Sequence, residues 1–243
     1  MKISVIAEFG GELSFEYISL ALKENIDIES IIFIGYEIDD HRRKLVSERT
    51  LGNYKFIDLI EALDQSIIPC YFTDDVNSQL TEKTLSHLAP ELVISGSTKI
   101  IRNPIWEIPK YGMLNCHSGF VQKYRGCSAV EWAILNDDPV GSSCHLMNEK
   151  IDAGELVSQD YLYIKNGDSY EIVRAKMIKH QAIVMMNGVK KIIQKPFDFS
   201  EEFDLGKYYR PMKDEDLINQ VKSRLINKAY SYYEMKNSLK VKL

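Results

Sequence analysis

The stretch "YGMLNCHSGFVQKYRGCSAVEWAILN", residues 111–136, runs from an apolar segment through a polar loop into a helical pattern. Its apolar segment stops at Leu114, and Asn115 and His117 follow on either side of Cys116. An extended backbone would point the amide and the imidazole to the same face of a sheet and the thiol to the other face. Because ligands bind beyond the carboxyl ends of strands in α/β sheets, this strand end is predicted to carry a binding or catalytic site.

Patterns on both sides of this stretch favour an α/β fold. Apolar segments typical of buried strands alternate upstream with helical patterns, and two alternating strands and a long helix follow downstream. The predicted strands cover residues 2–8, 29–37, 66–73, 91–97, 111–118, 140–148 and 155–164, and the long helix covers 169–193. We therefore expect a doubly wound, Rossmann-like, mostly parallel sheet. Residues 1–195 are expected to form the catalytic domain, and residues 196–243 a short, irregular C-terminal extension.

The bulk composition narrows the classes of function. A net charge of −5 over 243 residues disfavours a nucleic-acid binder, which usually carries a basic surface. The four cysteines form no CxxC pair and fit no zinc spacing, so we expect reduced thiols, no metal and a cytoplasmic protein. No segment approaches the roughly 18 apolar residues of a membrane span. The absence of G-x-G-x-x-G and of a phosphate-loop motif disfavours NAD enzymes and P-loop NTPases.

A carboxylate follows at the right place to complete a site. Asp152 lies in "NEKIDAGELVSQ", in a short turn between two predicted strands, where it could reach a neighbouring strand end. An amide can donate to a carbonyl oxygen, an imidazole can supply a proton or positive charge, and a carboxylate can orient the imidazole. Asn115, His117 and Asp152 together would form an acyl-transfer site. No G-x-S-x-G motif is present, so a covalent intermediate is not expected.

Each of these residues also has a structural interpretation. A histidine at a strand end can be a hydrogen-bonded structural group, and an aspartate before Ala-Gly is often a turn residue. Cys116 should point away from its neighbours and is interpreted as a buried core thiol. His145, on an alternating strand, could be a core histidine with its hydrogen bonds satisfied.

The ordered set of motifs is more specific than its members. The segment "GMLNCHSGFVQKYRGCSAVEWAILNDDPVGSSCHLMNEKIDAGELVSQ", about a fifth of the chain, closely resembles the formyltransferases that use 10-formyltetrahydrofolate. That family shows N-x-H at a strand end, Arg-Gly closing a loop, Trp-Ala on a helix, a Gly-to-His strand and D-x-G. These motifs stand here, in order, as Asn115–His117, Arg125–Gly126, Trp132–Ala133, Gly141–His145 and Asp152–Gly154.

The resemblance implies roles for individual residues. Asn115, His117 and Asp152 match the catalytic amide, imidazole and carboxylate of the family, with 10-formyltetrahydrofolate as co-substrate. The family's folate pocket is lined largely by backbone, and it corresponds here to Ser97, Lys99, Ile100, Ile101, Met147, Asn148, Glu149 and Ile151. One departure is the loop after His117, which reads "HSGFVQ" where the family usually has H-P-S-L-L-P. The shape of the acceptor pocket therefore does not follow from the resemblance.

Chain length favours one branch of the family. About 45 residues follow Pro196, too few and not basic enough for the C-terminal barrel of the enzymes that formylate methionyl-tRNA. The segment "AEFGGELSF" is a poor match to the phosphate loop of the glycinamide ribonucleotide enzymes. The remaining branch acts on nucleotide-linked amino sugars, and its members tend to be dimers. We therefore expect a homodimer that formylates dTDP-4-amino-4,6-dideoxyglucose for O-antigen lipopolysaccharide synthesis.

Alternatives to this expectation remain open. They are formyl transfer to glycinamide ribonucleotide or methionyl-tRNA, hydrolysis with water as acceptor, and a non-catalytic protein that binds folate or a nucleotide sugar. For the acceptor, we expect contacts from Arg125, Tyr208, Tyr209 and Arg210, because aromatic rings stack on bases or sugars and guanidinium groups pair with phosphates.

Overall fold

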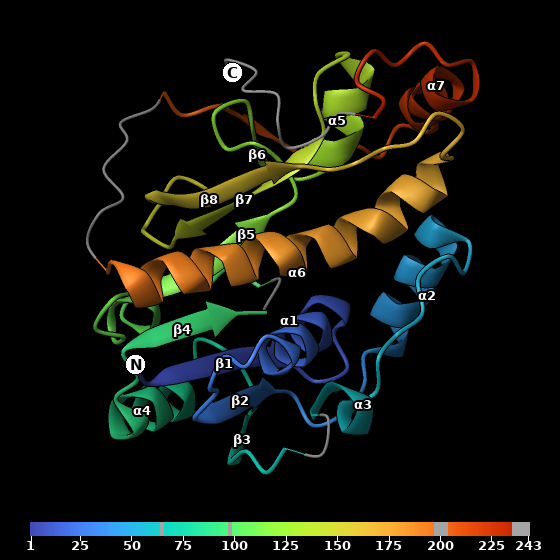
Figure 1. Ribbon diagram of the computed structural model, residues 1–243. Coiled ribbons are helices and arrows are strands. Elements are labelled where there is room, and N and C mark those ends of the chain that lie inside the picture. The colour runs from blue at the N-terminus through green and yellow to red at the C-terminus, as the bar shows by residue number, and fades with distance from the viewer. Residues whose placement is uncertain (64–65, 97–98, 197–203, 235–243) are drawn as a thin grey trace.

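A seven-stranded mixed sheet forms the centre of the computed structural model, which describes residues 1–63, 66–96, 99–196 and 204–234 (Figure 1). Its strands are β1 (Ile3–Glu8), β2 (Ser30–Ile34), β3 (Cys70–Thr73), β4 (Leu92–Ser95), β5 (Met113–His117), β7 (Gly141–Leu146) and β8 (Leu156–Tyr161). The strand order is β3-β2-β1-β4-β5-β7-β8. The first five strands are parallel, and β7 and β8 are antiparallel to their neighbours. The predicted mostly parallel sheet is confirmed.

Helices cover both faces of this sheet. They are α1 (Glu12–Lys23), α2 (Asp40–Thr50), α3 (Leu59–Leu63), α4 (Gln79–Leu88), the 3₁₀ helix η1 (Ile105–Glu107), α5 (Ala129–Leu135), α6 (Tyr170–Gln194) and α7 (Glu215–Ile226). In β1, Ile3, Val5 and Ala7 pack with α1 and α6 on one face. Ile6 packs on the other face, with α4 and η1. A strand buried on both faces explains the continuous apolar run that the sequence shows.

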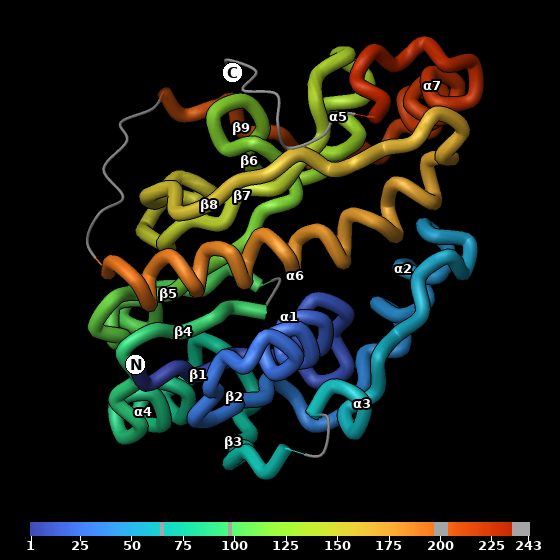
Figure 2. The backbone as a smooth tube through the Cα atoms, viewed as in Figure 1, coloured from blue at the N-terminus to red at the C-terminus, as the bar shows by residue number. Residues whose placement is uncertain are grey.

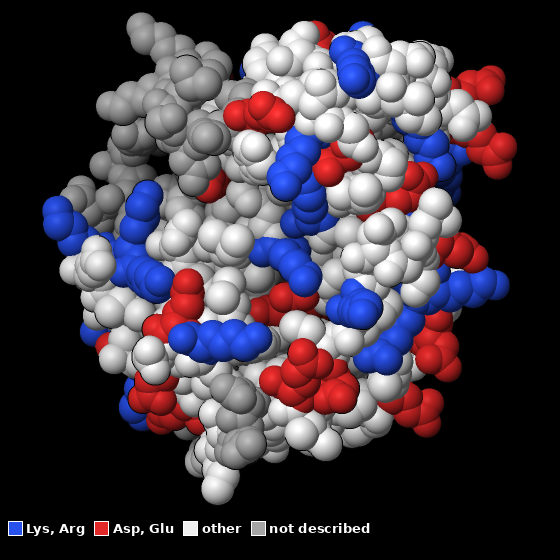
Figure 3. Space-filling model, turned by 45° about the vertical axis from the view of Figure 1, so that its right-hand side comes forward, with Lys and Arg blue, Asp and Glu red and all other residues white. Residues whose placement is uncertain are grey.

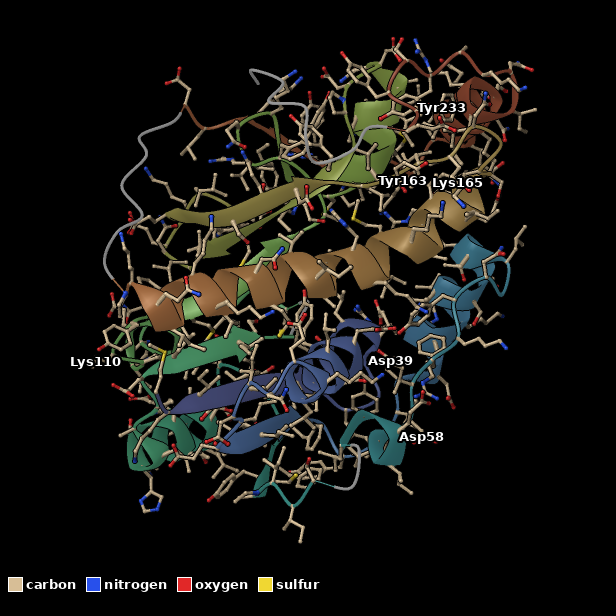
Figure 4. The ribbon with its side chains drawn as sticks, in the orientation of Figure 1. Asp39, Asp58, Lys110, Tyr163, Lys165 and Tyr233 are labelled. Carbon is tan, nitrogen blue, oxygen red and sulfur yellow. The ribbon has the colours of Figure 1, made fainter. Side chains whose placement is uncertain are left out.

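The helix α2 was not predicted from the sequence, and its composition explains why. Thr50 is its single buried residue, so it lacks the apolar stripe by which helices are recognised. Its first turn is fixed locally by Asp39, labelled in Figure 4, whose Oδ1 accepts a hydrogen bond from the backbone N–H of Arg42 at 2.9 Å. The helix packs against α1 through Arg42 and lies at the N-terminal end of α6 (Figures 1 and 2).

The C-terminal segment is more regular than the sequence indicated. Strand β9 (Lys207–Tyr209) pairs in parallel with β6 (Tyr124–Gly126) to form a separate two-stranded sheet (Figure 2). Helix α7 packs against α5 through buried Val221 and Leu225, spaced one helical turn apart. The chain then passes Tyr233, which lies near Tyr163 and Lys165 in Figure 4, and the N–H of Glu234 donates to the carbonyl of Ile164 at 2.7 Å.

Within the four described ranges, none of the helices combines the length and the apolar content that a bilayer crossing requires.

Candidate active site

The predicted catalytic residues meet at the carboxyl end of β5. Asn115 and His117 occupy the third and last positions of that strand. Strand β7 runs antiparallel beside it and turns at its end, and this turn carries Asp152 back toward β5. The turn closes tightly because residue 154 is glycine: a Cβ atom there would lie 1.5 Å from the carbonyl oxygen of Leu146. Asp152 itself has a φ of +47°, a left-handed conformation that aspartate tolerates better than most residues.

Asp152 is the centre of the cluster. Its Oδ2 atom accepts a hydrogen bond from the backbone N–H of Gly126 at 2.8 Å and lies 3.4 Å from His117 Nδ1. Its Oδ1 atom lies 3.4 Å from Asn115 Nδ2 and 3.6 Å from His145 Nε2. Burial alone would raise the pKa of this carboxyl, but the two imidazoles and the Gly126 N–H outweigh burial and lower the pKa to about 2. Asp152 is therefore ionised throughout the neutral range.

His117 is a buried imidazole between two acceptors. Its Nε2 lies 2.8 Å from the carbonyl oxygen of Tyr124, which can only accept, so Nε2 carries the proton. Burial lowers the pKa of His117 below its ordinary 6.5, against the opposite effect of Asp152, so the ring is mostly neutral at neutral pH. A proton taken up at Nδ1 would face the Asp152 carboxylate. Burial thus favours a neutral ring, whereas the sequence analysis expected His117 to supply a proton or a positive charge.

His145 is part of the cluster, which the sequence analysis did not assign. Its Nδ1 donates to the carbonyl of Leu146 at 3.0 Å, which leaves Nε2 to accept from Asn115 Nδ2 at 3.3 Å. The amide group of Asn115 is therefore oriented by both His145 and Asp152. The antiparallel register that pairs His145 with Asn115 is what brings it here. Two alternating strands were predicted, but alternation does not fix the register between them.

A cleft of about 690 Å³ opens beside the cluster. One wall is formed by the segments predicted to hold folate, and the residues of that prediction lining it are Lys99, Ile100, Ile101, Met147, Asn148, Glu149 and Ile151. Ser97, also predicted, lies outside the described residues. Ile100 and Ile151 are 59% and 40% exposed, so this wall presents apolar surface to solvent. Such a surface fits the flat ring of a pterin, which would cover it.

The same cleft is lined by charged residues that the sequence analysis missed. They are Glu12, Arg42 and Arg49 from α1 and α2, Glu131 from α5, and Arg174 from α6. The basic run "HRRKLVSER" at residues 41–49 was the available signal for two of them. Because α2 shows no apolar periodicity, nothing in the sequence placed that run beside the strand ends.

The four residues predicted to contact the acceptor are separated by the structure. Tyr208 lines the cleft. Tyr209, next to it, packs on Trp132 with ring centroids 5.1 Å apart. Arg125 and Arg210 are not among the lining residues, and the backbone carbonyl of Arg210 accepts a hydrogen bond from Trp132 Nε1 at 3.5 Å. Of the four, Tyr208 lines the cleft.

Cys116 and the question of a metal can be addressed from the same geometry. The Cys116 thiol lies in the core cluster on the α6 side of the sheet, and burial raises its pKa well above the ordinary value. A thiol in that state is not a nucleophile. Across the described ranges, no group of three or more His, Cys, Asp or Glu side chains is arranged to hold a metal ion.

Comparisons with known proteins bear on this site. The formyl transferase family model matches residues 14–189. The bifunctional polymyxin resistance protein ArnA of Wigglesworthia glossinidia brevipalpis is 27% identical over 219 residues, which cover 88% of this chain and 32% of that protein. The methionyl-tRNA formyltransferase of Prochlorococcus marinus (strain NATL2A) is 27% identical over 135 residues, covering 54% of this chain and 40% of that enzyme. The chain thus spans about a third to two fifths of the length of these two relatives.

Solved structures share the fold at low sequence identity. A sugar N-formyltransferase from Shewanella sp FDAARGOS_354 superposes with a TM-score of 0.59 at 18% identity, covering 88% of this chain and 78% of that one. Glycinamide ribonucleotide transformylase 1 from Symbiobacterium toebii gives 0.62 at 14% identity, covering 86% and 94%. These likenesses agree with the fold, and the family match spans well over half of the chain and includes Asn115, His117 and Asp152. The chain belongs to the formyl transferase family.

Proposed function

We propose that this protein transfers a formyl group from 10-formyltetrahydrofolate to the amino group of a nucleotide-linked amino sugar. The observation that carries the proposal is the convergence of Asn115 and His117 on the Asp152 carboxylate, each at 3.4 Å, beside a cleft of about 690 Å³. A merely structural histidine would need no second titratable partner and no open cleft beside it.

The residues of the cluster suit the three tasks of amine acylation. Folate bound against the Lys99–Ile101 and Met147–Ile151 wall would supply an activated formyl carbon. Asn115 would turn one of its two amide N–H groups from His145 or Asp152 to the formyl oxygen, where negative charge develops as the amine attacks. His117, neutral before the reaction, would accept the proton that the amine loses and pass it to N10 of the folate as the bond between that nitrogen and the formyl carbon breaks, so that tetrahydrofolate leaves. Asp152 would stabilise the imidazolium formed in that step and keep both side chains in orientation.

The choice of acceptor is supported by the relatives and by the cleft. Three of the similar proteins are named as a sugar N-formyltransferase, a 4-N formyltransferase and the bifunctional polymyxin resistance protein ArnA. The cleft is also lined by arginines, which can pair with the phosphates of a nucleotide-linked acceptor. As the specific acceptor we propose dTDP-4-amino-4,6-dideoxyglucose, for O-antigen synthesis by a homodimer, with Tyr208 among the contacts.

The test is formyl transfer to a panel of acceptors. The protein is incubated with 10-formyltetrahydrofolate and one acceptor at a time. The acceptors are dTDP-, UDP- and GDP-linked amino sugars, glycinamide ribonucleotide and methionyl-tRNA, and the mass of each is measured by mass spectrometry. We expect one added formyl group on a nucleotide-linked amino sugar. Transfer to one of the other acceptors alone, or release of formate at full rate without any amine, would overturn the proposal.

Matched histidine variants test the site itself. His117→Gln should lose about 10²–10³ of the turnover, the usual cost of removing one group that stabilises the transition state. His87→Gln changes an exposed histidine at the end of α4, away from the cleft, and should keep full turnover. Equal turnover of the two variants would remove His117 from the mechanism.

A further inference from the structure

The cleft continues beyond the catalytic cluster into a half that the proposed folate wall does not use. We call it the arginine-lined half, and define it by Arg49 in the last turn of α2, Glu131 in the first turn of α5 and Arg174 in α6. These helices are distant in the sequence but lie around the N-terminal end of α6 in Figures 1 and 2, where α2 packs against α6. Figure 3 shows Lys and Arg side chains gathered across the middle of this side of the molecule, with acidic groups among them.

Glu131 is a buried carboxylate with one oxygen unused. The residue is 4% exposed and lines the cleft. Its Oε1 accepts a hydrogen bond from the Tyr170 hydroxyl at 2.7 Å and lies 3.6 Å from Arg174 Nη1. Its Oε2 has no hydrogen-bond partner among the described residues. A buried acceptor without a partner is costly, so one that lines a cleft points to a ligand that donates to it.

The Glu131 carboxyl is held in its charged form. Burial would raise its pKa, but Arg174, the Tyr170 hydroxyl, its own backbone N–H and the more distant Arg49 together lower the pKa below the ordinary value. A charged oxygen accepts a hydrogen bond more strongly than a neutral one and repels a phosphate placed directly against it. The ligand group that meets Oε2 is therefore a hydroxyl or an N–H, and not an anion.

Arg49 supplies the complementary charge. Its neighbour Arg42 is committed to α1, because its guanidinium donates to both carboxylate oxygens of Glu12 at 2.6 and 2.8 Å. Arg49 is exposed in the cleft wall, and no ion pair is recorded for it within the described part of the chain. Its charge nevertheless acts on Glu131 and Tyr170 across the cleft. It is thus placed to meet an anion that enters beside Glu131.

We propose that the arginine-lined half binds the nucleoside diphosphate part of the acceptor, with Arg49 pairing with the diphosphate and Glu131 Oε2 accepting a hydrogen bond from a hydroxyl or N–H of the same molecule. The inference rests on the proposed function and assigns it two specificity residues. A free phosphate would satisfy Arg49 but would leave Oε2 unpaired. A neutral amine would do the reverse, whereas a nucleotide-linked sugar carries both kinds of group.

Binding without turnover tests the diphosphate contact. Thymidine, uridine and guanosine diphosphates are titrated calorimetrically into the native protein, Arg49→Ala and Lys44→Ala. Lys44 is an exposed residue of the same helix, so the control removes the same charge outside the cleft. We expect at least one nucleotide to bind, and binding to be about ten- to a hundredfold weaker in Arg49→Ala but unchanged in Lys44→Ala. Added salt should weaken native binding more than that of Arg49→Ala.

The Glu131 contact is tested with the nucleotide-linked amino sugar. Glu131→Gln keeps an oxygen for the Tyr170 hydroxyl but turns a donor toward the ligand, so the KM of the sugar should rise about tenfold while that of folate stays constant. Glu171→Gln serves as the matched control: it makes the same substitution at a carboxylate that pairs with Lys222 and does not line the cleft, and it should leave the KM of the sugar unchanged. An equal rise of KM in both variants would make Glu131 a packing residue and overturn its role.

The outcomes separate this inference from the proposed function. If formyl transfer occurs but Arg49→Ala and Lys44→Ala bind nucleotide equally well, the diphosphate lies elsewhere and the inference is wrong while the proposed function stands. If a nucleoside diphosphate binds and Arg49→Ala weakens it, but no nucleotide-linked sugar is formylated, the inference stands and the proposed function fails. Failure of all three nucleotides to bind the native protein overturns the inference.

Discussion

Asp152→Asn should remove most of the formyl-transfer activity and leave the fold intact. Asparagine has the same shape as aspartate and tolerates the left-handed backbone that residue 152 adopts, so the turn itself is not strained. What changes is the number of acceptors. The carboxylate faces donors with both oxygens, whereas an amide has one oxygen and one NH2 group. If that oxygen stays on the Gly126 N–H, the NH2 group meets the NH2 group of Asn115.

The size of the expected loss in kcat follows from this contact between two donors. Asn115 must turn or retreat to avoid a donor–donor contact, so its N–H no longer points where the formyl oxygen is expected, and we expect kcat to fall about 10²–10³-fold. The stability cost follows from the pKa of Asp152, which is lowered from 3.8 to about 2. That shift corresponds to about 2.4 kcal/mol, or a decrease in Tm of about 5–10 °C for a chain of this size.

The sign of the pH dependence gives a second check. Because the folded-state pKa is depressed, the stabilisation is complete above 3.8 and is lost as the pH falls toward about 2. The Asp152→Asn protein should lack that component of acid destabilisation. The assays are mass-detected formyl transfer and thermal melts from pH 2 to 7, with Asp27→Asn, an exposed aspartate, as control. A kcat within threefold of native, or an unchanged Tm at pH 7, would refute this account of the cluster.

Three further predictions concern proton transfer, the turn and the C-terminal segment. Burial lowers the pKa of His117 below 6.5, and the ring acts when neutral, so kcat/KM should be level above pH 6.5 and fall below it; an increase toward acid pH would contradict a proton-accepting role. The free energy of unfolding should also decrease as the pH falls below 6.5, because His117 takes up a proton more readily in the unfolded chain than in the folded protein. Gly154→Ala places a Cβ atom 1.5 Å from a backbone oxygen, so it should lower the free energy of unfolding in chemical denaturation by more than about 3 kcal/mol. The control Gly52→Ala should lower it by about 1–2 kcal/mol, because there is space for a Cβ atom there and the φ of +71° is the only strain. Leu225→Ala, at a position 1% exposed, should cost about 2–5 kcal/mol, whereas Ile226→Ala, at 71%, should cost less than about 0.5; equal costs would mean that α7 is not packed in solution.

Asn115, His117 and Asp152 could be expected to lie together because their placement is local. Asn115 and His117 share a face by the period of a strand, and the end of that strand is visible in the sequence as the end of an apolar run. Asp152 follows in a turn whose Ala-Gly ending is equally visible. The partner of Asn115, by contrast, depends on how β7 is registered against β5. A shift by two residues would keep every side chain on its face and place Ser143 or Met147 where His145 lies.

The charged wall of the cleft depends on packing over long sequence distances. Arg49 and Arg174 are about 125 positions apart, and each lies on a helix whose place is decided by other residues: α2 is held to α1 by the pairing of Arg42 with Glu12. Val46 of this helix also packs with Ala175 and Ile178 of α6, but one partly buried valine gives no periodic signature from which the position of the helix could be inferred. The same limit applies to Glu131, which precedes the family-like Trp132 but shows its unpaired oxygen only when Tyr170 and Arg174 are placed.

Tyr208 and Tyr209 point to opposite sides of the short strand β9. Tyr208 and Tyr209 were predicted together as acceptor contacts because aromatic rings stack on bases or sugars, in a segment expected to be irregular. In β9 they alternate, so Tyr208 faces the cleft and Tyr209 packs on Tyr124 and Trp132. A strand of three residues is too short for its alternation to be distinguished from an aromatic pair in a loop.

The position of the catalytic carboxylate depends on this C-terminal strand. Asp152 takes its shortest hydrogen bond from the N–H of Gly126, the residue of β6 that pairs with Tyr209. The two strands approach so closely there that a Cβ atom on residue 126 would lie 2.4 Å from the Tyr209 carbonyl oxygen, and the φ of +85° also favours glycine. Any movement of β9 is therefore transmitted to the donor that fixes Asp152. The same strand presents Tyr208 to the cleft, so the lining of the cleft at Tyr208 and the orientation of the carboxylate are set by one short piece of backbone.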